Sequence, residues 1–316
     1  MAEQGTHMRR AGQSLVESKR SPRNARTKAP ARRRPGPVAQ PRQEAGATPL
    51  TAADGLRIWT PTPPLTTREP GPAHELPIWR EWLAGFDWVL LRASTAYFGI
   101  GLPQGDGTAV VTVPGFLGTD TYLLELHLWL RRMGYRPYAS QIGRNADCPN
   151  LLLSRLLKTI EQAHKDTGRR VHLIGHSLGG VLARSAASHH PELVASVVSL
   201  GAPFRGIRSH PVVLRTRDVL RRFLSGLPSR QFLPPGCYTG HCTCNFVEAL
   251  DRFPSDVREL AIFSRGDGVV DWRMCVTGDP GKDREVLGTH VGLAVNPFVY
   301  RLLAEFFAAP AGSRAA

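Results

Sequence analysis

The chain has 316 residues, 42% of them hydrophobic, and a formal net charge of +14 at neutral pH. This composition supports one large core, and the lack of any run of 18 apolar residues predicts that nothing spans a membrane. Residues 1–48 hold eleven Lys or Arg against three Glu, a net of +8, which leaves +6 for the rest. The charge therefore belongs mainly to a basic tail, and no specific nucleic-acid binding is expected.

The N-terminal segment has a composition typical of disordered protein. Residues 1–48 contain five Pro and almost no large apolar side chains, so burial would not offset the entropy of ordering. We predict a disordered N-terminal region and linker over 1–75 and a flexible C-terminus over 309–316. Two interpretations of the tail stay open: peripheral contact with anionic surfaces, or a solvated tail without a dedicated partner. No apolar segment of signal-peptide length follows the basic residues, so we expect a cytoplasmic protein, at most peripheral to a membrane.

Helical and strand patterns alternate between residues 76 and 308, the predicted folded domain. Apolar residues at helical spacing indicate helices, and short β-branched runs before Gly or Pro indicate strands. The predicted order is helix 79–97, strand 109–113, helix 119–130, strand 135–139, helix 150–163, strand 170–174, helix 178–188, strand 194–200, strand 257–263, strand 285–287 and helix 297–307. Such alternation predicts an α/β fold: a mainly parallel sheet with helices on both faces, whose ligands gather at the carboxyl ends of the strands.

Residues 204–250 break this alternation. The segment is irregular, with Pro, Gly and Cys among scattered apolar residues, and is interpreted as an insertion. Its apolar side chains could line a pocket or could be ordinary packing, and the sequence leaves both open. They are Phe223, Leu224, Leu227, Phe232 and Leu233.

The most informative motif is Gly-His-Ser-Leu-Gly-Gly at 175–180, which directly follows the apolar run 170–174. A serine between a strand and a helix in Gly-x-Ser-x-Gly is pushed out of the sheet by a strained turn, and the glycines leave room for close packing. The alternative is a Gly/Ser-rich loop that matches by chance. Because a strand precedes the motif and a helix follows it, we predict that Ser177 is a nucleophile.

A serine hydroxyl needs a base, and the base needs a carboxylate that fixes its tautomer. Asp267 follows strand 257–263 almost immediately, and His290 lies between the last strand and the last helix. We predict that His290 is the base and Asp267 the acid. Asp271 is the alternative acid, although it could instead bind nearby backbone or pair with Arg273. The alternative for His290 is a capping or exposed loop histidine.

An acyl-transfer reaction also develops a negative oxygen that backbone N–H groups must stabilise. One predicted donor is the N–H of Leu178, immediately after the serine. The other is the N–H of Phe116, in the loop after strand 109–113, where Pro114 and Gly115 let the chain fold close to Ser177.

The cysteine pattern does not favour a metal site. The five cysteines are Cys148, Cys237, Cys242, Cys244 and Cys275. Buried thiols are the default interpretation. A disulfide from the 237–244 group to Cys275 is one alternative, and a zinc site is another, although the spacing fits paired Cys-x₂-Cys ligands poorly.

Taken together, these motifs resemble the α/β-hydrolase superfamily, especially bacterial esterases and triacylglycerol-lipase-like members. The resemblance covers approximately residues 76–308 and includes Pro-Gly-Phe at 114–116, the 175–180 motif, Gly-Ala-Pro at 201–203, Ser-Arg-Gly-Asp-Gly at 264–268 and Thr-His at 289–290. It implies the α/β-hydrolase fold with a lid or cap at about 204–250. It also implies the order Ser177, Asp267, His290 for nucleophile, acid and base, and no cofactor. Many lipases have His-Gly where this chain has Pro114-Gly115, which sets the Phe116 donor apart from the family pattern.

The expected function is a serine hydrolase of carboxylic esters, acting on apolar acyl esters or lipids through an acyl-serine. One alternative is an acyltransferase that passes the same acyl group to an alcohol. Another is a non-catalytic lipid-binding protein on a hydrolase fold, although a binder would not need all three of Ser177, Asp267 and His290. The sequence does not give the acyl length or the oligomeric state.

Overall fold

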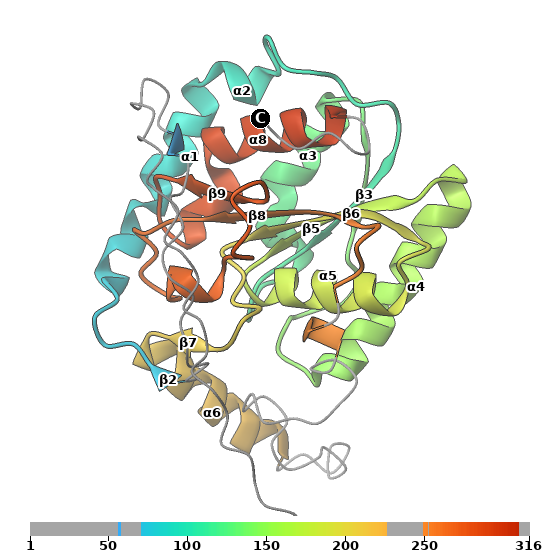
Figure 1. Ribbon diagram of the computed structural model, residues 1–316. Coiled ribbons are helices and arrows are strands. Elements are labelled where there is room, and N and C mark those ends of the chain that lie inside the picture. The colour runs from blue at the N-terminus through green and yellow to red at the C-terminus, as the bar shows by residue number, and fades with distance from the viewer. Residues whose placement is uncertain (1–55, 58–70, 226–248, 252, 310–316) are drawn as a thin grey trace, which may run out of the picture. The chain divides into compact units, whose positions relative to one another are not determined.

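The structure, a computed structural model, describes residues 56–57, 71–225, 249–251 and 253–309 (Figure 1). The chain divides into two compact units, Met1–Gly46 and Ala47–Ala316, and the first lies wholly outside the described residues. The predicted disorder of the tail and nearly all of the predicted flexible C-terminus also fall outside them. Everything below concerns the second unit.

Seven strands form one sheet in the order β1-β9-β8-β6-β5-β3-β4. All neighbours pair in parallel except β1, which runs antiparallel to β9. The strands are β1 (Leu56–Arg57), β3 (Ala109–Val113), β4 (Arg136–Ala139), β5 (Val171–His176), β6 (Val194–Leu200), β8 (Arg258–Phe263) and β9 (Asp283–Val286). A separate parallel pair joins β2 (Gly71–Pro72) to β7 (Arg208–Ser209). The predicted mainly parallel sheet is confirmed.

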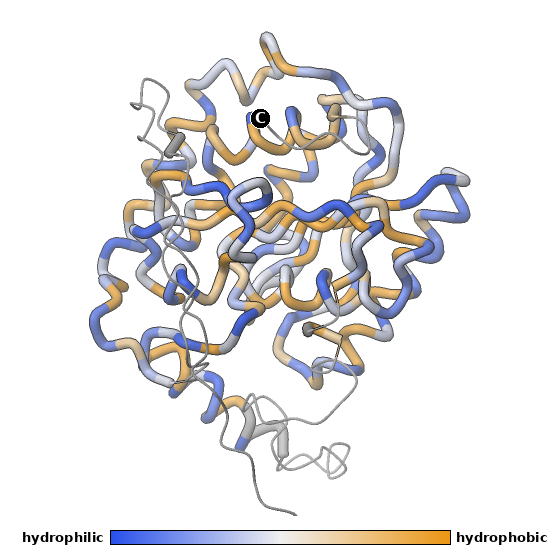
Figure 2. The backbone as a smooth tube through the Cα atoms, in the orientation of Figure 1, coloured by the Kyte–Doolittle hydropathy of each residue, from blue (hydrophilic) through white to orange (hydrophobic). Residues whose placement is uncertain are grey.

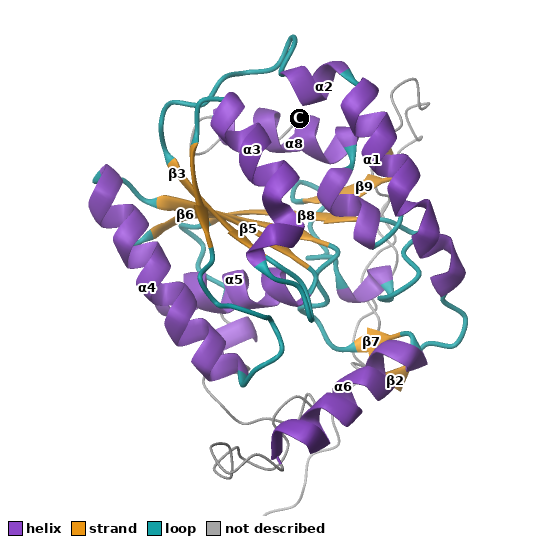
Figure 3. Ribbon diagram, turned by 180° about the vertical axis from the view of Figure 1, so that it is seen from behind, coloured by secondary structure: helices purple, strands orange, loops and turns teal. Residues whose placement is uncertain are grey.

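Helices cover both faces of this sheet. Helices α1, α3 and α8 lie on one side, and α4 and α5 lie on the other (Figure 1, Figure 3). The α-helices are α1 (Ala84–Ala93), α2 (Thr95–Phe98), α3 (Leu124–Arg132), α4 (Pro149–Thr167), α5 (Leu178–His189), α6 (Pro211–Ser225) and α8 (Pro297–Ala308). Short 3₁₀ helices are η1 (Ile78–Leu83), η2 (Asp120–Leu123), η4 (Ala249–Asp251), η5 (Trp272–Met274) and η6 (Val291–Val295).

The core consists of two apolar layers separated by the sheet. All five residues of β3 are buried, as expected for a strand covered on both faces. One layer joins the sheet to α4 and α5, and the other joins it to α1, α3 and α8. Figure 2 shows the hydrophobic residues following the strands through the centre of the unit. His172 points to the second layer, as its strand position predicts, where its ring stacks on Phe307 at 4.5 Å between centroids.

Two predicted elements differ from the structure. The expected helix 79–97 is divided, because Ser94 adopts an extended conformation (ψ 153°) and its hydroxyl accepts a hydrogen bond from Tyr97 N to start α2. Within the segment predicted to be irregular, 204–250, residues 211–225 form α6, an amphipathic helix, so the prediction is wrong there. The five side chains named above as candidate pocket residues of this segment lie outside the described side chains. Of the helices that the structure describes, none is both long and apolar enough to cross a membrane.

Candidate active site

The Ser177 turn is a single residue between a strand and a helix. Strand β5 ends at His176 and α5 begins at Leu178, so Ser177 alone makes the turn, with φ 52° and ψ −126°. A non-glycine residue at positive φ costs about 1–3 kcal/mol and persists only where the surroundings enforce it. Here Ser177 N donates to Leu200 O at 2.8 Å and Ser177 O accepts from Gly180 N at 2.9 Å. The strained turn predicted from the motif is therefore present.

The three glycines of the motif are required by close packing. A Cβ on Gly175 would collide with the backbone of Gly179 and Gly180, and one on Gly179 would collide with the carbonyl oxygens of Val113 and Pro114. A Cβ on Gly180 would lie 2.5 Å from Cβ of Ala202. The motif thus brings α5 against β3 and β6 at the carboxyl end of the sheet.

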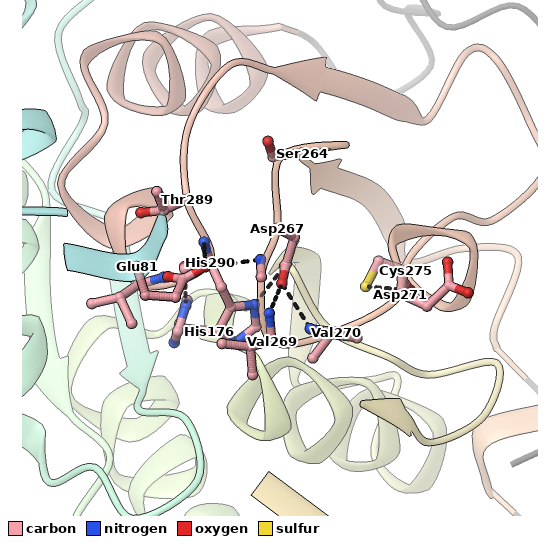
Figure 4. Close-up of polar contacts among 12 residues, drawn as sticks. Glu81, His176, Ser264, Asp267, Val269, Val270, Asp271, Cys275, Thr289 and His290 are labelled. Atoms are coloured by element: carbon pink, nitrogen blue, oxygen red, sulfur yellow. Dashed lines mark hydrogen bonds and ion pairs between the residues drawn. The ribbon is translucent and has the colours of Figure 1, made fainter. Parts of the chain in front are cut away.

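Asp267 and His290 form a buried pair at the same end of the sheet. His290 Nδ1 lies 2.6 Å from Asp267 Oδ2, and the two side chains are 5% and 2% exposed (Figure 4). The other carboxylate oxygen, Asp267 Oδ1, accepts from the N–H groups of Val269 and Val270 at 2.8 and 2.7 Å. Both oxygens of Asp267 are therefore held, and one of them orients the imidazole.

The environment favours the protonated imidazole of His290. Burial by itself lowers the pKa of His290, but the charge and hydrogen bond of Asp267, together with the charge of Glu81, raise the pKa above its ordinary value. An imidazole stabilised in its charged form by a buried carboxylate is what a general base requires when it accepts a proton during reaction.

Asp271, the alternative acid, is bound elsewhere. Its carboxylate caps η5 by accepting from Arg273 N at 3.1 Å. It also pairs with Arg208 Nε at 3.1 Å and with Arg273 Nη1 at 3.4 Å. Both contacts that the sequence suggested for a structural Asp271, backbone and Arg273, are present, and the structure brings Asp267 rather than Asp271 to His290.

A largely apolar cavity of about 550 Å³ lies at this edge. Ser177 and His290 both line it, together with Phe116 and Leu178. Helix α6 contributes Val212, Val213 and Leu214. Among the described residues no hydrogen bond joins Ser177 to His290; such contacts often form only when substrate is bound. Four of the five predicted site residues therefore share one cavity, and the fifth, Asp267, lies behind His290.

Parts of the sequence are similar to those of known proteins. A model of the alpha/beta hydrolase fold matches residues 139–235, which include the Ser177 turn. The chain is 33% identical over 156 residues to a triacylglycerol lipase of Burkholderia plantarii, covering 46% of this chain and 43% of that protein. It is 35% identical over 129 residues to a triacylglycerol lipase of Pseudarthrobacter phenanthrenivorans, covering 38% of this chain and 40% of that protein. Over residues 139–235 the chain thus matches the alpha/beta hydrolase fold family.

The chain spans less than half the length of these two curated relatives. Among solved structures, one described as a metagenome-derived lipolytic enzyme is 17% identical, with a TM-score of 0.46, over 65% of this chain and 95% of that chain. The α/β-hydrolase fold rests on the chain's own strand order and serine turn and on the family match over residues 139–235.

The loop after β3 that carries Phe116 is fixed by Asn145, a residue that the sequence did not single out. Asn145 Nδ2 donates to Pro114 O at 2.7 Å, Asn145 O accepts from Leu117 N at 2.8 Å, and Asn145 N donates to Gly118 O at 2.9 Å. Asn145 is fully buried. The loop that carries Phe116 is thus held from one side by three hydrogen bonds of a single residue.

His176 supports the site from the strand side. Its Nε2 lies 2.9 Å from His290 O, which can only accept, so Nε2 carries the proton. Burial and the neighbouring charge of His290 lower the pKa of His176 to about 3. The Tyr122 hydroxyl donates to Val291 O at 3.0 Å on the next residue. His176 is thus a neutral donor to the loop that carries His290.

Glu81 is the other site residue that sequence motifs missed. It lies on η1, before the first central strand, and its carboxylate contacts the loops of both Asp267 and His290 (Figure 4). No motif signals it, because its partners are backbone N–H groups.

Of the cysteines in the predicted disulfide, the structure describes Cys275. Cys275 is a free, buried thiol, which contradicts the disulfide alternative for it. Cys237, Cys242 and Cys244 lie outside the described residues. Within the described part of the chain, no group of three or more His, Cys, Asp or Glu side chains is arranged to hold a metal ion.

Proposed function

We propose that the chain is a serine hydrolase that cleaves carboxylic esters with apolar acyl groups. The observation that carries the proposal is the shared cavity: Ser177, at positive φ, and His290, paired with buried Asp267, line the same apolar space. The triacylglycerol lipases that the chain resembles support an ester as the substrate. The apolar lining supports an apolar acyl chain.

In the proposed mechanism Ser177 Oγ attacks the ester carbonyl carbon while His290 Nε2 takes the hydroxyl proton. The N–H groups of Phe116 and Leu178 stabilise the oxyanion of the tetrahedral intermediate. Collapse of the intermediate breaks the bond to the alcohol, which leaves with the proton from His290. Water, activated by His290, then releases the acid and restores Ser177. Asp267 keeps His290 in the tautomer that each step needs.

Helix α6 supports the proposal of a cap segment over about 204–250. It follows β7 and contributes apolar residues to the cavity wall opposite the sheet. A helix at the wall of the cavity would limit the size of the acyl groups that the cavity accepts. The proposed location remains cytoplasmic, with the basic tail in peripheral contact with anionic surfaces; both stay predictions, as does the domain boundary near residue 76.

The test combines a covalent probe with a substrate series. A fluorophosphonate should label the wild-type chain and leave Ser177→Ala unlabelled, and chromogenic esters of graded chain length should be cleaved with a preference for acyl groups that fill the cavity. Adding alcohol acceptors and analysing the products separates an acyltransferase from a hydrolase. A folded wild type that binds apolar esters but is neither labelled nor active would instead be a lipid-binding protein, and the proposal would fail.

A further inference from the structure

Glu81 joins two loops that follow different strands. The acid loop, residues 264–271, follows β8, and the base loop, residues 287–291, follows β9. Glu81 Oε1 accepts hydrogen bonds from Gly268 N at 2.9 Å and from His290 N at 3.0 Å. Its second oxygen, Oε2, accepts from Val291 N at 2.9 Å. One carboxylate therefore binds the residue after Asp267, His290 itself and the residue after His290.

We propose that Glu81 is a positioning residue that fixes the base loop against the acid loop and so sets the geometry of the His290–Asp267 pair. This inference rests on the proposed ester hydrolysis. Hydrogen bonds from N–H groups to a carboxylate are about twice as strong as those between neutral groups. A second link, from Ser264 Oγ to Gly288 O at 2.6 Å, joins the same loops farther from the imidazole.

The chain around Glu81 is pressed closely against the acid loop. A Cβ on Gly268 would lie 2.6 Å from Pro77 O and 2.9 Å from Ile78 Cα, so only glycine lets the two segments approach. Three aromatic side chains on the outer side of the same stretch, Trp79, Trp82 and Phe86, are all more than 60% exposed. Glu81 itself is turned inward and half-buried. The segment is therefore oriented with its carboxylate toward the site.

Glu81 also adds negative charge beside the imidazole. The titratable groups around His290 are Asp267 on the acid loop, His176 on β5, Glu81 on η1, Tyr122 on η2 and, through Thr289, Asp87 on α1. Burial lowers the pKa of His290, whereas the charge and hydrogen bond of Asp267 and, to a smaller extent, the charge of Glu81 raise it. Removing that charge should lower the pKa of the base, whereas a residue that only held the fold would leave it unchanged.

Two variants separate reach from charge. Glu81→Gln keeps the length of the side chain, loses the charge and places an amide donor against N–H groups. Glu81→Asp keeps the charge but is one methylene too short to reach both loops. Glu161→Gln, an exposed carboxylate on α4, is the control. We expect Glu81→Gln to lower kcat by about 10- to 100-fold, because small misplacements of catalytic groups have effects of this size, with KM within about twofold.

The pH profile of kcat/KM on a short chromogenic ester is the deciding measurement. The acidic limb reports the pKa of the free base, so it should move to lower pH in Glu81→Gln and stay in place in Glu81→Asp, although kcat falls in both. Far-UV and near-UV circular dichroism of each variant checks folding. An active wild type together with a Glu81→Gln variant that keeps kcat and the acidic limb would overturn this inference and leave the proposed function standing. A wild type that is neither active nor labelled by a fluorophosphonate would overturn both.

Discussion

The Ser177 turn and the Asp267–His290 pair lie at the same cavity, but contacts of different sequence separation position them. The turn lies within six consecutive residues, and its glycines allow the close packing of α5 around Ser177, which has positive φ. The pair is assembled from two loops 23 residues apart in the sequence and is contacted by Glu81, which lies 209 residues before His290. The motif that places Ser177 is thus local in the sequence, whereas the orientation of His290 depends on distant contacts. Substitutions should therefore act differently in the two regions.

The largest expected effect comes from the nucleophile. Ser177→Ala should lower kcat about a millionfold, as for comparable triads. The free energy of unfolding should stay nearly unchanged, because alanine removes only the hydroxyl group and adds no atom that could clash. Ester hydrolysis and fluorophosphonate labelling measure the first effect, and urea denaturation the second. Retention of more than one part in a thousand of the wild-type rate in a folded variant would mean that another group makes the attack.

The second effect tests which carboxylate serves the base. Asp267→Asn should lower kcat by about 10⁴-fold and move the acidic limb of the pH profile to lower pH, because the charge that raises the pKa of His290 is lost. Asp271→Asn is the matched control: its carboxylate binds Arg208 and Arg273 rather than His290, so we expect a change of less than about tenfold in kcat, with any loss appearing in stability instead. The reverse ranking of the two variants would assign the acid to Asp271.

A third substitution tests the local encoding of the serine turn. Gly179→Ala places a methyl group against the carbonyl oxygens of Val113 and Pro114, and overpacking of this kind destabilises by about 1–3 kcal/mol. Gly85→Ala on α1 meets no atom within 4 Å and should instead stabilise the helix by about 0.5–1 kcal/mol. Urea denaturation of both variants measures the difference. Equal free energies of unfolding would show that the turn tolerates a side chain and that the motif glycines are not required by packing.

The same contrast explains what could be predicted from the sequence. The succession of the central strands along the chain and the Ser177 turn follow from apolar runs and glycines, which are visible in short windows. Asp267 and His290 were found by their places after strands. Asn145 and Glu81 were not found, because each contacts backbone N–H or carbonyl groups, and such contacts leave no pattern in the sequence. Helix α6 is different: its apolar spacing is visible in the sequence, but it stands in a segment whose Pro, Gly and Cys residues indicate irregular structure.

The last expected effect, which is absent above the ordinary pKa of histidine, concerns the contact of His176 with the loop of His290, and its sign follows from the pKa of His176. In the folded chain this pKa is lowered to about 3, first by burial and then by the charge of His290, whereas an unfolded histidine titrates near its ordinary value. Between these two values the unfolded chain binds one more proton than the folded chain at this position, so stability is full above the ordinary pKa and falls as the pH decreases toward 3. His176→Asn removes that proton and should flatten the pH dependence of the free energy of unfolding by up to about 1.4 kcal/mol per pH unit. Urea denaturation at several pH values from 4 to 7 gives both slopes. Parallel slopes in the variant and the wild type would mean that His176 is protonated in the folded chain, and its role as a neutral donor to the base loop would then be wrong.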